Sequence, residues 1–455
     1  MSKLYAENIL IGSQWQKDKT LSISAEGIIE AVADGKDPQA EILVGSVIPG
    51  MVNCHSHAFQ RAFAGYSEYR GNSSDSFWSW RDIMYRFVAK ISPEDAHHIA
   101  SFVYTEMLKA GYTSVAEFHY LHRQFGGAHY DDPAEMSHQI IDAATSSGIA
   151  LTHLPVLYSY AGFGEKPASK AQARFLHSTE DYVELVRSLS GQYTCQENFS
   201  LGIAPHSLRA VSHSQLDEII PFVRSLDEKS PIHIHISEQL QEVEDCLAHY
   251  RKRPVEWLLD NYQIDENWCL IHATHLVDEE IKNLAKSDAV VGICPTTEAN
   301  LGDGIFPTSE FLKVGGNFAI GSDSHIAINI ADELRTLEYG QRLTQHQRAI
   351  LTNQNGFSVG QYLYSKAARD GAKAINQNTG SIDIGKRADL VVLNSEHPSL
   401  FNKSGSFVLD SAIFACSQLP VKDVFVAGKQ VISSGQHLLD EDLLKNYRSV
   451  VNRIG

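Results

Sequence analysis

The chain has 455 residues, of which 43% are hydrophobic and 20% charged, an ordinary composition for a soluble globular protein with a large core. Its formal net charge of −17 argues against nucleic acid and anionic membranes as partners. The N-terminus lacks a basic stretch followed by an apolar one, and no apolar run reaches the roughly 18 residues of a membrane span, so we expect a cytoplasmic protein.

The six cysteines are scattered along the chain and form no C-x-x-C pair. Several of them lie in apolar runs that are typical of strands. We therefore expect buried free thiols rather than a disulfide framework.

The first part of the chain, residues 3–48, consists of short strand-like runs separated by turn residues and has no helical periodicity. This pattern predicts a small β unit that leads into the main domain.

From residue 46 onward, apolar strand candidates alternate with amphipathic helical stretches. The strand candidates are residues 47–55, 113–120, 149–159, 200–205, 231–237, 268–273, 289–295 and 317–323. The helical stretches between them are residues 93–110, 133–147, 180–189, 214–227, 240–261 and 278–285. Eight strands in one unbroken alternation predict an α/β fold with a closed (β/α)₈ TIM-like barrel. An open doubly wound sheet would carry a Gly-rich turn after its first strand, where this chain has HSHAFQ.

The last part of the chain resembles the first in character. Two helical stretches, residues 329–342 and 359–375, precede short β runs at 380–394 and 421–432. The simplest organisation is one small β domain built from residues 1–48 and 376–455, beside a barrel of residues 49–375.

Polar residues gather at the ends of the predicted strands, where barrel enzymes place their reactive groups. In an extended strand alternate side chains point the same way, so His55 and His57 face one space together. An isolated H-x-H pair is more often a surface or hydrogen-bonded pair than a metal site. Here the strand ends also carry other polar residues: His119, Tyr120, His206, Arg209, His233, His235, Glu238, His272, His275 and Asp323.

Three imidazoles and a carboxylate form a natural set of ligands for a divalent metal. We assign His55, His57, His235 and Asp323 to this role. Zinc and iron both suit these ligands, so the ligand set leaves the identity of the metal open.

A hydrolytic reaction also needs groups that move protons and stabilise charge. Glu238 follows His235 by three residues and is the best-placed proton shuttle, with His272 and Asp323 as further catalytic residues. The alternative for Glu238 is that it merely opens the following helix. His233, His275 and His119 are better interpreted as supporting or packing histidines than as ligands.

These motifs together resemble the metal-dependent amidohydrolase superfamily. The resemblance rests on H-S-H after the first strand, H-x-x-E after the fifth, a histidine after the sixth and GSDS after the eighth. The later segment GSIDIGKRADLVVLN is similar to the superfamily's return into its β-sandwich domain, so the resemblance implies that the small domain of residues 1–48 and 376–455 is a β-sandwich. Many members bind two metals through a modified lysine at the end of the fourth strand. This chain has LGIAPHSLR there, without a lysine, so the resemblance implies a single divalent metal, with zinc as the favoured ion.

Four segments resemble a branch of this superfamily that hydrolyses C–N bonds of linear amidines: NCHSHAFQRAFAG, DSFWSWRDIMYR, EFHYLH and APHSLRAV. The resemblance implies a small dicarboxylate substrate, a homodimer, and substrate-binding roles for Gln60, Arg81, Tyr120, His206 and Arg209. Cys54 departs from the branch's more familiar leucine without touching a predicted ligand.

The residues support such a substrate independently. Arginine binds carboxylates in a bidentate fork, and both Arg81 and Arg209 belong to segments that overhang the predicted barrel mouth. Residues 58–92 form an unusually long connection, rich in Phe, Trp and Arg, which suggests an insert that grips the substrate. Alternatives for binding the carboxylates are Arg61, Arg70, Arg86 and Arg123, although each is better interpreted as ordinary surface charge.

Two other interpretations stay open from the sequence. An aminohydrolase acting on a purine- or pyrimidine-like ring would share the metal site but leave Arg81 and Arg209 without an evident task. A catalytically silent scaffold would be expected to have lost metal ligands, whereas all four are present.

Overall fold

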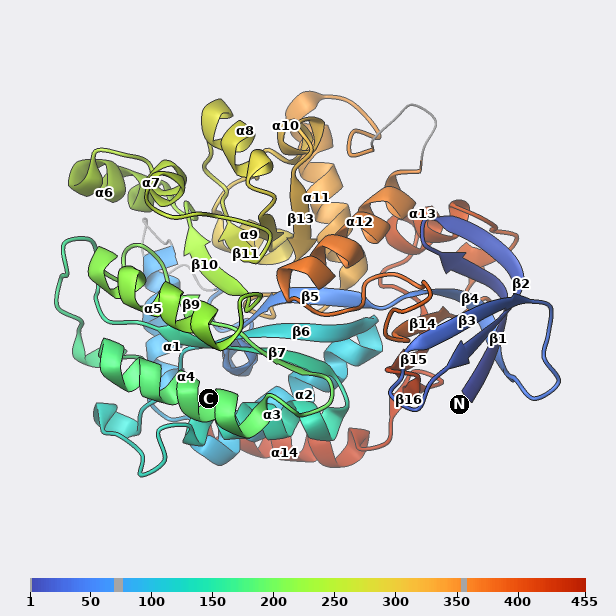
Figure 1. The fold of residues 1–455 in the computed structure, drawn as a ribbon, viewed down its shortest axis with the longest axis horizontal. Coiled ribbons are helices and arrows are strands. Elements are labelled where there is room, and N and C mark those ends of the chain that lie inside the picture. Colours follow the sequence, from blue (N-terminus) through green and yellow to red (C-terminus); the bar gives the residue numbers. More distant parts are fainter. Residues whose placement is uncertain (1, 69–76, 353–357) are drawn as a thin grey trace.

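Two bodies of β structure organise the protein: a sheet of eight strands built from both chain ends, and a set of parallel strands surrounded by helices (Figure 1). The computed structural model describes residues 2–68, 77–352 and 358–455. The chain thus has the α/β fold expected from its sequence.

The eight-stranded sheet has the order β17-β16-β15-β14-β4-β1-β2-β3. Its strands are β1 (Ser2–Ile11), β2 (Gln14–Ile23), β3 (Ile29–Asp34), β4 (Glu41–Pro49), β14 (Leu390–Leu393), β15 (Val421–Val426), β16 (Lys429–Ser433) and β17 (Gln436–His437). The two chain ends meet where β4 pairs antiparallel with β14, with Val47 opposite Val392. Alternation of apolar and polar residues buries one side of the sheet in a small core of its own.

The parallel strands form two hydrogen-bonded groups. These strands are β5 (Met51–Ser56), β6 (Tyr112–His119), β7 (Ala150–Leu157), β8 (Phe199–Leu201), β9 (Ala204–Pro205), β10 (Ile232–Ile236), β11 (Trp268–His272), β12 (Val290–Ile293) and β13 (Asn317–Ile320). Strands β5 to β9 form one group and β10 to β13 the other. Parallel bridges join the groups at both edges, Ser56 with Asp323 and Ile203 with Ile232, an arrangement consistent with a barrel.

Helices cover the outside of the parallel strands (Figure 1). They are α1 (Phe77–Val88), α2 (Pro93–Ala110), α3 (Glu135–Ser147), α4 (Thr179–Tyr193), α5 (His213–Leu226), α6 (Leu240–Tyr250), α7 (Pro254–Asn261), α8 (Asp278–Lys286), α9 (Pro295–Leu301), α10 (Thr308–Lys313), α11 (Ile330–Gln345), α12 (Val359–Ala374), α13 (Phe407–Phe414) and α14 (Asp440–Ile454). Local sequence sets their ends. Helix α2, for example, starts with a capping box between Ser92 and Asp95 and ends at Gly111 with φ of 98°.

Three predicted elements are divided in the structure. The strand expected over 47–55 is the end of β4 and most of β5, which lie in different sheets and are separated at Gly50. The helix expected over 240–261 is α6 and α7, because the chain turns at Arg251 (φ 61°) and Pro254 then starts a new helix. The strand expected over 200–205 is β8 and β9, separated by Gly202. A Cβ atom at Gly202 would lie 2.4 Å from the Pro231 carbonyl oxygen, so the chain passes close to its neighbour there.

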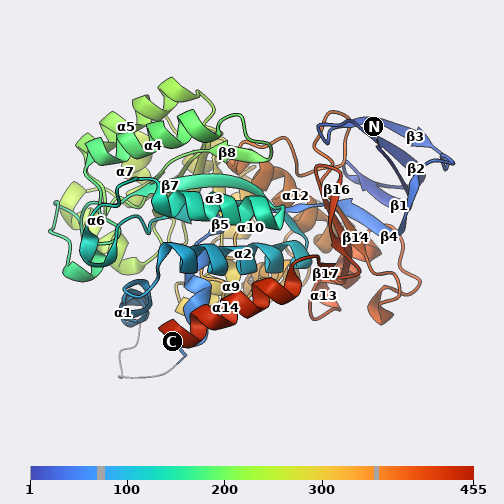
Figure 2. The same ribbon diagram turned by 90° about the horizontal axis from the view of Figure 1, so that it is seen from below.

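The C-terminal helix α14 leaves the eight-stranded sheet and lies along α2 (Figure 2). Tyr447 stacks on Phe102 with ring centroids 4.2 Å apart, and Arg453 forms an ion pair with Asp95. The Lys90 ammonium group also donates to the Ile454 carbonyl oxygen at 2.7 Å. The end of the chain therefore covers helices of the parallel-strand body, which the short β runs of the tail did not indicate.

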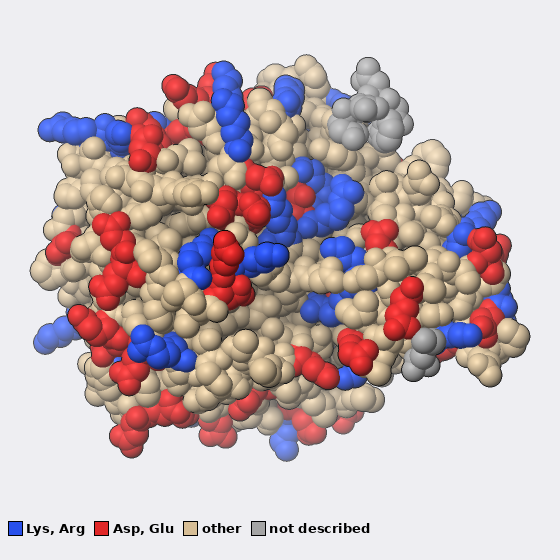
Figure 3. All heavy atoms as spheres, viewed as in Figure 1, with Lys and Arg blue, Asp and Glu red and all other residues tan. Residues whose placement is uncertain are grey.

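The surface charges, the helix lengths and the cysteines can be compared with what the composition predicts. On the face drawn in Figure 3, acidic side chains crowd the lower border while Lys and Arg gather nearer the middle. Over the described residues, no helix combines the length and the apolar character needed to cross a bilayer. All six cysteines are unpaired, and all except Cys195 are buried.

A buried ion pair connects the eight-stranded sheet to the parallel strands. Arg387 lies against Asp389, with Nη2 and Oδ2 2.6 Å apart, and also donates to Ser114 of β6 at 2.6 Å. Gln377 accepts a further hydrogen bond from Arg387 at 2.7 Å, while Asp389 accepts the backbone N–H of Ala427 at 2.9 Å. Arg387 and Asp389 therefore form a structural joint between the eight-stranded sheet and the parallel strands.

Replacing Arg387 with Met should lower the free energy of unfolding by about 3–5 kcal/mol, because it leaves the Asp389 carboxylate buried without its cation. Chemical unfolding followed by tryptophan fluorescence would measure the change. Lys386→Met removes the adjacent positive charge outside this joint and serves as the control. Equal unfolding midpoints for the two variants would contradict the role of the ion pair.

Candidate active site

The predicted ligands come from strands that are far apart in the sequence and meet at one end of the parallel strands. Residue 323 pairs directly with β5: the Asp323 N–H donates to the His55 carbonyl at 3.0 Å, and the His57 N–H donates to the Asp323 carbonyl at 3.1 Å. His235 follows on β10 and His272 ends β11. Backbone pairing thus fixes where each of these side chains begins.

The side-chain atoms of the predicted ligands face one another within hydrogen-bonding or ion-pair distances. The Nε2 atoms of His55 and His235 are 3.0 Å apart. The Oδ1 atom of Asp323 lies 3.5 Å from His55 Nε2 and 3.4 Å from His57 Nε2. Three histidines, His55, His57 and His235, also have ligand atoms close enough together to hold one ion.

Hydrogen bonds on the far side of two rings prepare them for a metal. His57 Nδ1 lies 2.8 Å from the Phe118 carbonyl oxygen, and His235 Nδ1 lies 3.1 Å from the His206 carbonyl oxygen. A carbonyl only accepts, so each Nδ1 carries the proton and each Nε2 presents its lone pair. Burial lowers the pKa of His57 to about 3 and holds the pKa of His55 and His235 well below the usual range. Neutral imidazoles beside a carboxylate suit a divalent cation.

Acidic groups surround His272 next to this cluster. Its Nε2 lies 3.8 Å from Asp323 Oδ2 and 3.9 Å from Glu238 Oε1. Burial opposes the charged ring, but Glu238, Glu298 and Asp323 outweigh it and raise the pKa of His272 to about 10. Burial likewise raises the pKa of Asp323 to about 7, with His272 acting in the opposite direction and Glu238 adding to the rise.

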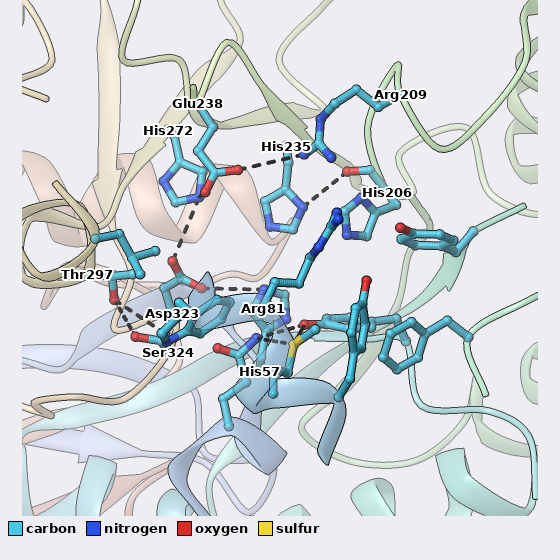
Figure 4. Close-up of a pocket in the computed structure, with 18 residues that line it drawn as sticks. His57, Arg81, His206, Arg209, His235, Glu238, His272, Thr297, Asp323 and Ser324 are labelled. Carbon is cyan, nitrogen blue, oxygen red and sulfur yellow. Dashed lines mark hydrogen bonds and ion pairs between the residues drawn. The ribbon is translucent and has the colours of Figure 1, made fainter. Parts of the chain in front are cut away.

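A pocket opens over the cluster, and the predicted substrate-binding residues form its walls (Figure 4). Except for His55, which lies fully buried behind the others, every predicted site residue lines it: His57, Gln60, Arg81, Tyr120, His206, Arg209, His235, Glu238, His272 and Asp323. The structure thus brings the predicted set together at one place.

One side of the pocket carries a buried guanidinium group. Arg209 is 7% exposed and approaches Glu238 Oε2 and Glu242 Oε2, each at 3.9 Å. Burial lowers the pKa of Arg209, but Glu242 and Glu238 outweigh it and raise the pKa above its ordinary value. Both ion pairs are long, and among the described residues Arg209 makes no side-chain hydrogen bond. Its N–H groups are therefore available to an anionic ligand.

Part of the predicted insert over residues 58–92 also lines the pocket, while residues 69–76 of it lie outside the described residues. Arg81, Met84 and Tyr85 occupy one face of α1 at a spacing of three and four residues, and this face looks into the pocket. Gln60 donates to the Tyr120 hydroxyl at 2.7 Å, whereas its own Oε1 is buried without a partner among the described residues.

The sequence missed several pocket residues. They are Trp80, Met84, Tyr85, Tyr158, Phe175, Thr297, Leu301 and Ser324. Helical periodicity from Arg81 identifies Met84 and Tyr85, and Tyr158 lies at the end of a predicted strand. Phe175 lies in a loop without any local pattern that predicts it. Glu298, which contacts His272 Nδ1 at 3.1 Å, was also missed.

The remaining histidine candidates lie outside the pocket. His233 is buried against the Ala374 carbonyl, to which its Nε2 donates at 2.8 Å, and His119 is buried next to His122 and His153. His275 does not line the pocket either.

The alternative arginines also have other positions. Arg61 donates to the His325 carbonyl at 2.6 Å, and Arg123 forms an ion pair with Asp181 at 2.7 Å. Arg86 is exposed on α1, and Arg70 is outside the described residues. Arg81 and Arg209 are the arginines that line the described part of the pocket.

The chain as a whole is similar to several known proteins. The chain is 46% identical over 455 residues to formimidoylglutamate deiminase of Pseudomonas aeruginosa, with 100% of both chains covered. It matches the crystal structure of an amidohydrolase from Brucella melitensis with a TM-score of 0.93 and 42% identity over 100% of both chains. An adenosine deaminase from Xanthomonas campestris with bound zinc has the same fold, with a TM-score of 0.83 and 22% identity over 99% of this chain and 98% of that chain.

A model of the amidohydrolase family covers residues 46–431, from β4 through the parallel strands to β16. This range includes every residue of the histidine and aspartate cluster. Together with the full-length relative at 46% identity, it shows that the chain belongs to the amidohydrolase family.

Proposed function

We propose that this protein hydrolyses N-formimidoyl-L-glutamate to N-formyl-L-glutamate and ammonia, a reaction of histidine degradation. The observation that carries the proposal is the 46% identity, over the whole of both chains, to formimidoylglutamate deiminase. The pocket supports it, because two arginines lie beside a group of metal-binding side chains.

His55, His57, His235 and Asp323 are the residues that would hold one divalent metal, for which zinc is the favoured ion. When bound, such a metal lowers the pKa of a water molecule to roughly 7 and so supplies hydroxide at neutral pH. The structural relative that contains zinc supports this choice of ion.

Glu238 is the proposed proton shuttle. Its carboxylate lies over the pocket between His272 and Arg209, at 3.9 Å from each. In the proposed reaction it takes a proton from the attacking water and gives it to the nitrogen that leaves as ammonia. His272 would stabilise the charge that develops on the formimidoyl group, and Asp323 is a further proton acceptor.

The substrate carries two carboxylates, which Arg209 and Arg81 would bind. Gln60 could accept a substrate N–H through its unpartnered Oε1 atom, while Tyr120 and His206 complete the wall around the formimidoyl end. The aromatic rings of the same pocket would exclude water from the reacting carbon.

We also propose an overall architecture, an oligomeric state and a cellular location for the protein. They are a closed (β/α)₈ barrel over residues 49–375, a β-sandwich from residues 1–48 and 376–455, a homodimer, and a cytoplasmic location without nucleic-acid or membrane partners. The bridges at both edges of the parallel strands support the barrel.

The direct test offers formimidoylglutamate and guanine in parallel and measures ammonia. We expect release from formimidoylglutamate alone. Release from guanine would favour the ring aminohydrolase, whereas no release from either substrate by a metal-loaded protein would favour the silent scaffold.

Glu238→Gln should reduce turnover at least about 10²-fold, because the amide cannot carry the proton. Metal content and thermal unfolding should stay as in the wild type. Glu242→Gln is the matched control: it also removes a carboxylate that faces Arg209, but one that does not line the pocket. Turnover by Glu238→Gln close to that of the control would exclude Glu238 as the shuttle.

Arg209→Met should raise KM for formimidoylglutamate roughly 10–100-fold, as expected for a lost charge-assisted hydrogen bond, with a smaller effect on kcat. Steady-state kinetics with increasing substrate would measure both constants. Arg86→Met removes an exposed arginine of α1 and should leave both constants unchanged. An unaltered KM in Arg209→Met would mean that the carboxylates bind elsewhere.

Chelation should remove one metal ion per chain together with activity, and added zinc should restore both. Elemental analysis gives the stoichiometry independently of activity. His235→Gln should bind metal much more weakly, whereas His233→Gln, on the same strand but bonded to Ala374, should retain it. Two ions per chain, or equal loss in both variants, would contradict the assigned ligands.

A further inference from the structure

His272 is held from behind by a carboxylate that the proposed reaction has not used. Glu298 lies on α9 and is 4% exposed. Its Oε1 atom is 3.1 Å from His272 Nδ1 and also accepts the backbone N–H of Cys294 at 2.9 Å. A buried carboxylate oxygen that accepts two hydrogen bonds is held in place, and one of its two donors is the His272 ring.

The hydrogen bond to Glu298 determines the direction in which the other ring nitrogen of His272, Nε2, points. A ring bound through Nδ1 can no longer rotate freely about its side-chain bonds, so Nε2 is directed to the opposite side. There it faces Glu238 Oε1 at 3.9 Å and Asp323 Oδ2 at 3.8 Å, inside the pocket. Glu298 itself does not line the pocket and cannot touch a ligand there.

The backbone of His272 gives a second reason for such support. Its φ of 68° lies in the left-handed region, and Ala273 follows with φ of 47°. Residues other than glycine adopt this conformation at a cost, and it persists where surrounding contacts enforce it. The contact with Glu298 is one of these contacts, because it ties the end of β11 to α9.

His272, Cys294 and Glu298 are also close enough together to suggest a second cation site. The hydrogen bonds argue against that reading. Glu298 Oε1, the oxygen nearest His272, already accepts the Cys294 N–H, and a donor hydrogen there repels a cation. The group therefore acts as a support for the imidazole.

We infer that Glu298 is a positioning residue: its carboxylate holds His272 through Nδ1–H so that Nε2 faces the reacting group beside Glu238 and Asp323. This inference rests on the proposed deimination. It adds a residue of α9 to the groups on which the rate of that reaction depends.

Glu298→Leu and Glu298→Gln test the inference as a pair. Leucine removes the acceptor, so kcat should fall about 10–100-fold while KM for formimidoylglutamate changes little. Glutamine keeps an oxygen for both donors and should recover most of the lost kcat. Metal content and the thermal midpoint are measured for each variant, because a purely structural role would change these and not kcat per bound metal.

A double-mutant cycle with His272→Asn shows whether Glu298 acts through His272. If it does, adding Glu298→Leu to His272→Asn should cost almost nothing more, because the ring to be positioned is already absent. An equal fall in both backgrounds, or wild-type kcat in Glu298→Leu, would overturn the inference. A wild-type protein that releases no ammonia from formimidoylglutamate would instead refute the proposed function, so the two failures are distinguishable.

Discussion

The pairing between β5 and the residues after β13 is the constraint on which the site depends. Ser56 and Asp323 form a parallel bridge, and two backbone hydrogen bonds fix Asp323 against His55 and His57. This contact joins the edges of the parallel strands and, in the same step, places a carboxylate between two imidazoles. Asp323 has φ of 47°, a left-handed conformation that costs about 1–3 kcal/mol in a residue other than glycine. The backbone contact that joins β5 to the residues after β13 is therefore also the contact that brings the site together.

Burial makes the charged groups around the pocket dependent on one another. Arg209 faces Glu238 and Glu242, and Glu298 faces His272 with hardly any exposed surface. A buried charge without a partner is costly, so each of these contacts offsets part of the cost of burying its two members. The proposed metal-binding histidines are uncharged instead, because burial lowers the pKa of His57, for example, to about 3. The pocket thus has neutral nitrogen donors at its floor and paired charges along its walls.

Local sequence predicted most of the elements and the main site residues. Alternation along a strand placed His55 and His57 on one side, and the rule that reactive groups follow parallel strands selected His235, His272 and Asp323. Boundaries were less predictable where a single residue ends an element. Pro254 divides one expected helix, and Gly202 divides one expected strand because the Pro231 backbone passes beside it. The path of α14 along α2 depends on contacts with residues such as Phe102, more than three hundred positions earlier, which no local pattern reveals.

What the sequence determined by itself was chemistry and order: which residues can bind a metal or move a proton, and in which succession of strands they occur. Periodicity and residue type carry that information, because both are properties of short segments. Only the tertiary structure decided which side chains support the others. Glu298 is locally an ordinary helix residue, and its role follows from the 3.1 Å contact with His272. That contact exists because α9 follows β12, the strand that pairs with β11. Contacts of this kind depend on distances between elements, and those distances are set by the packing of the whole chain.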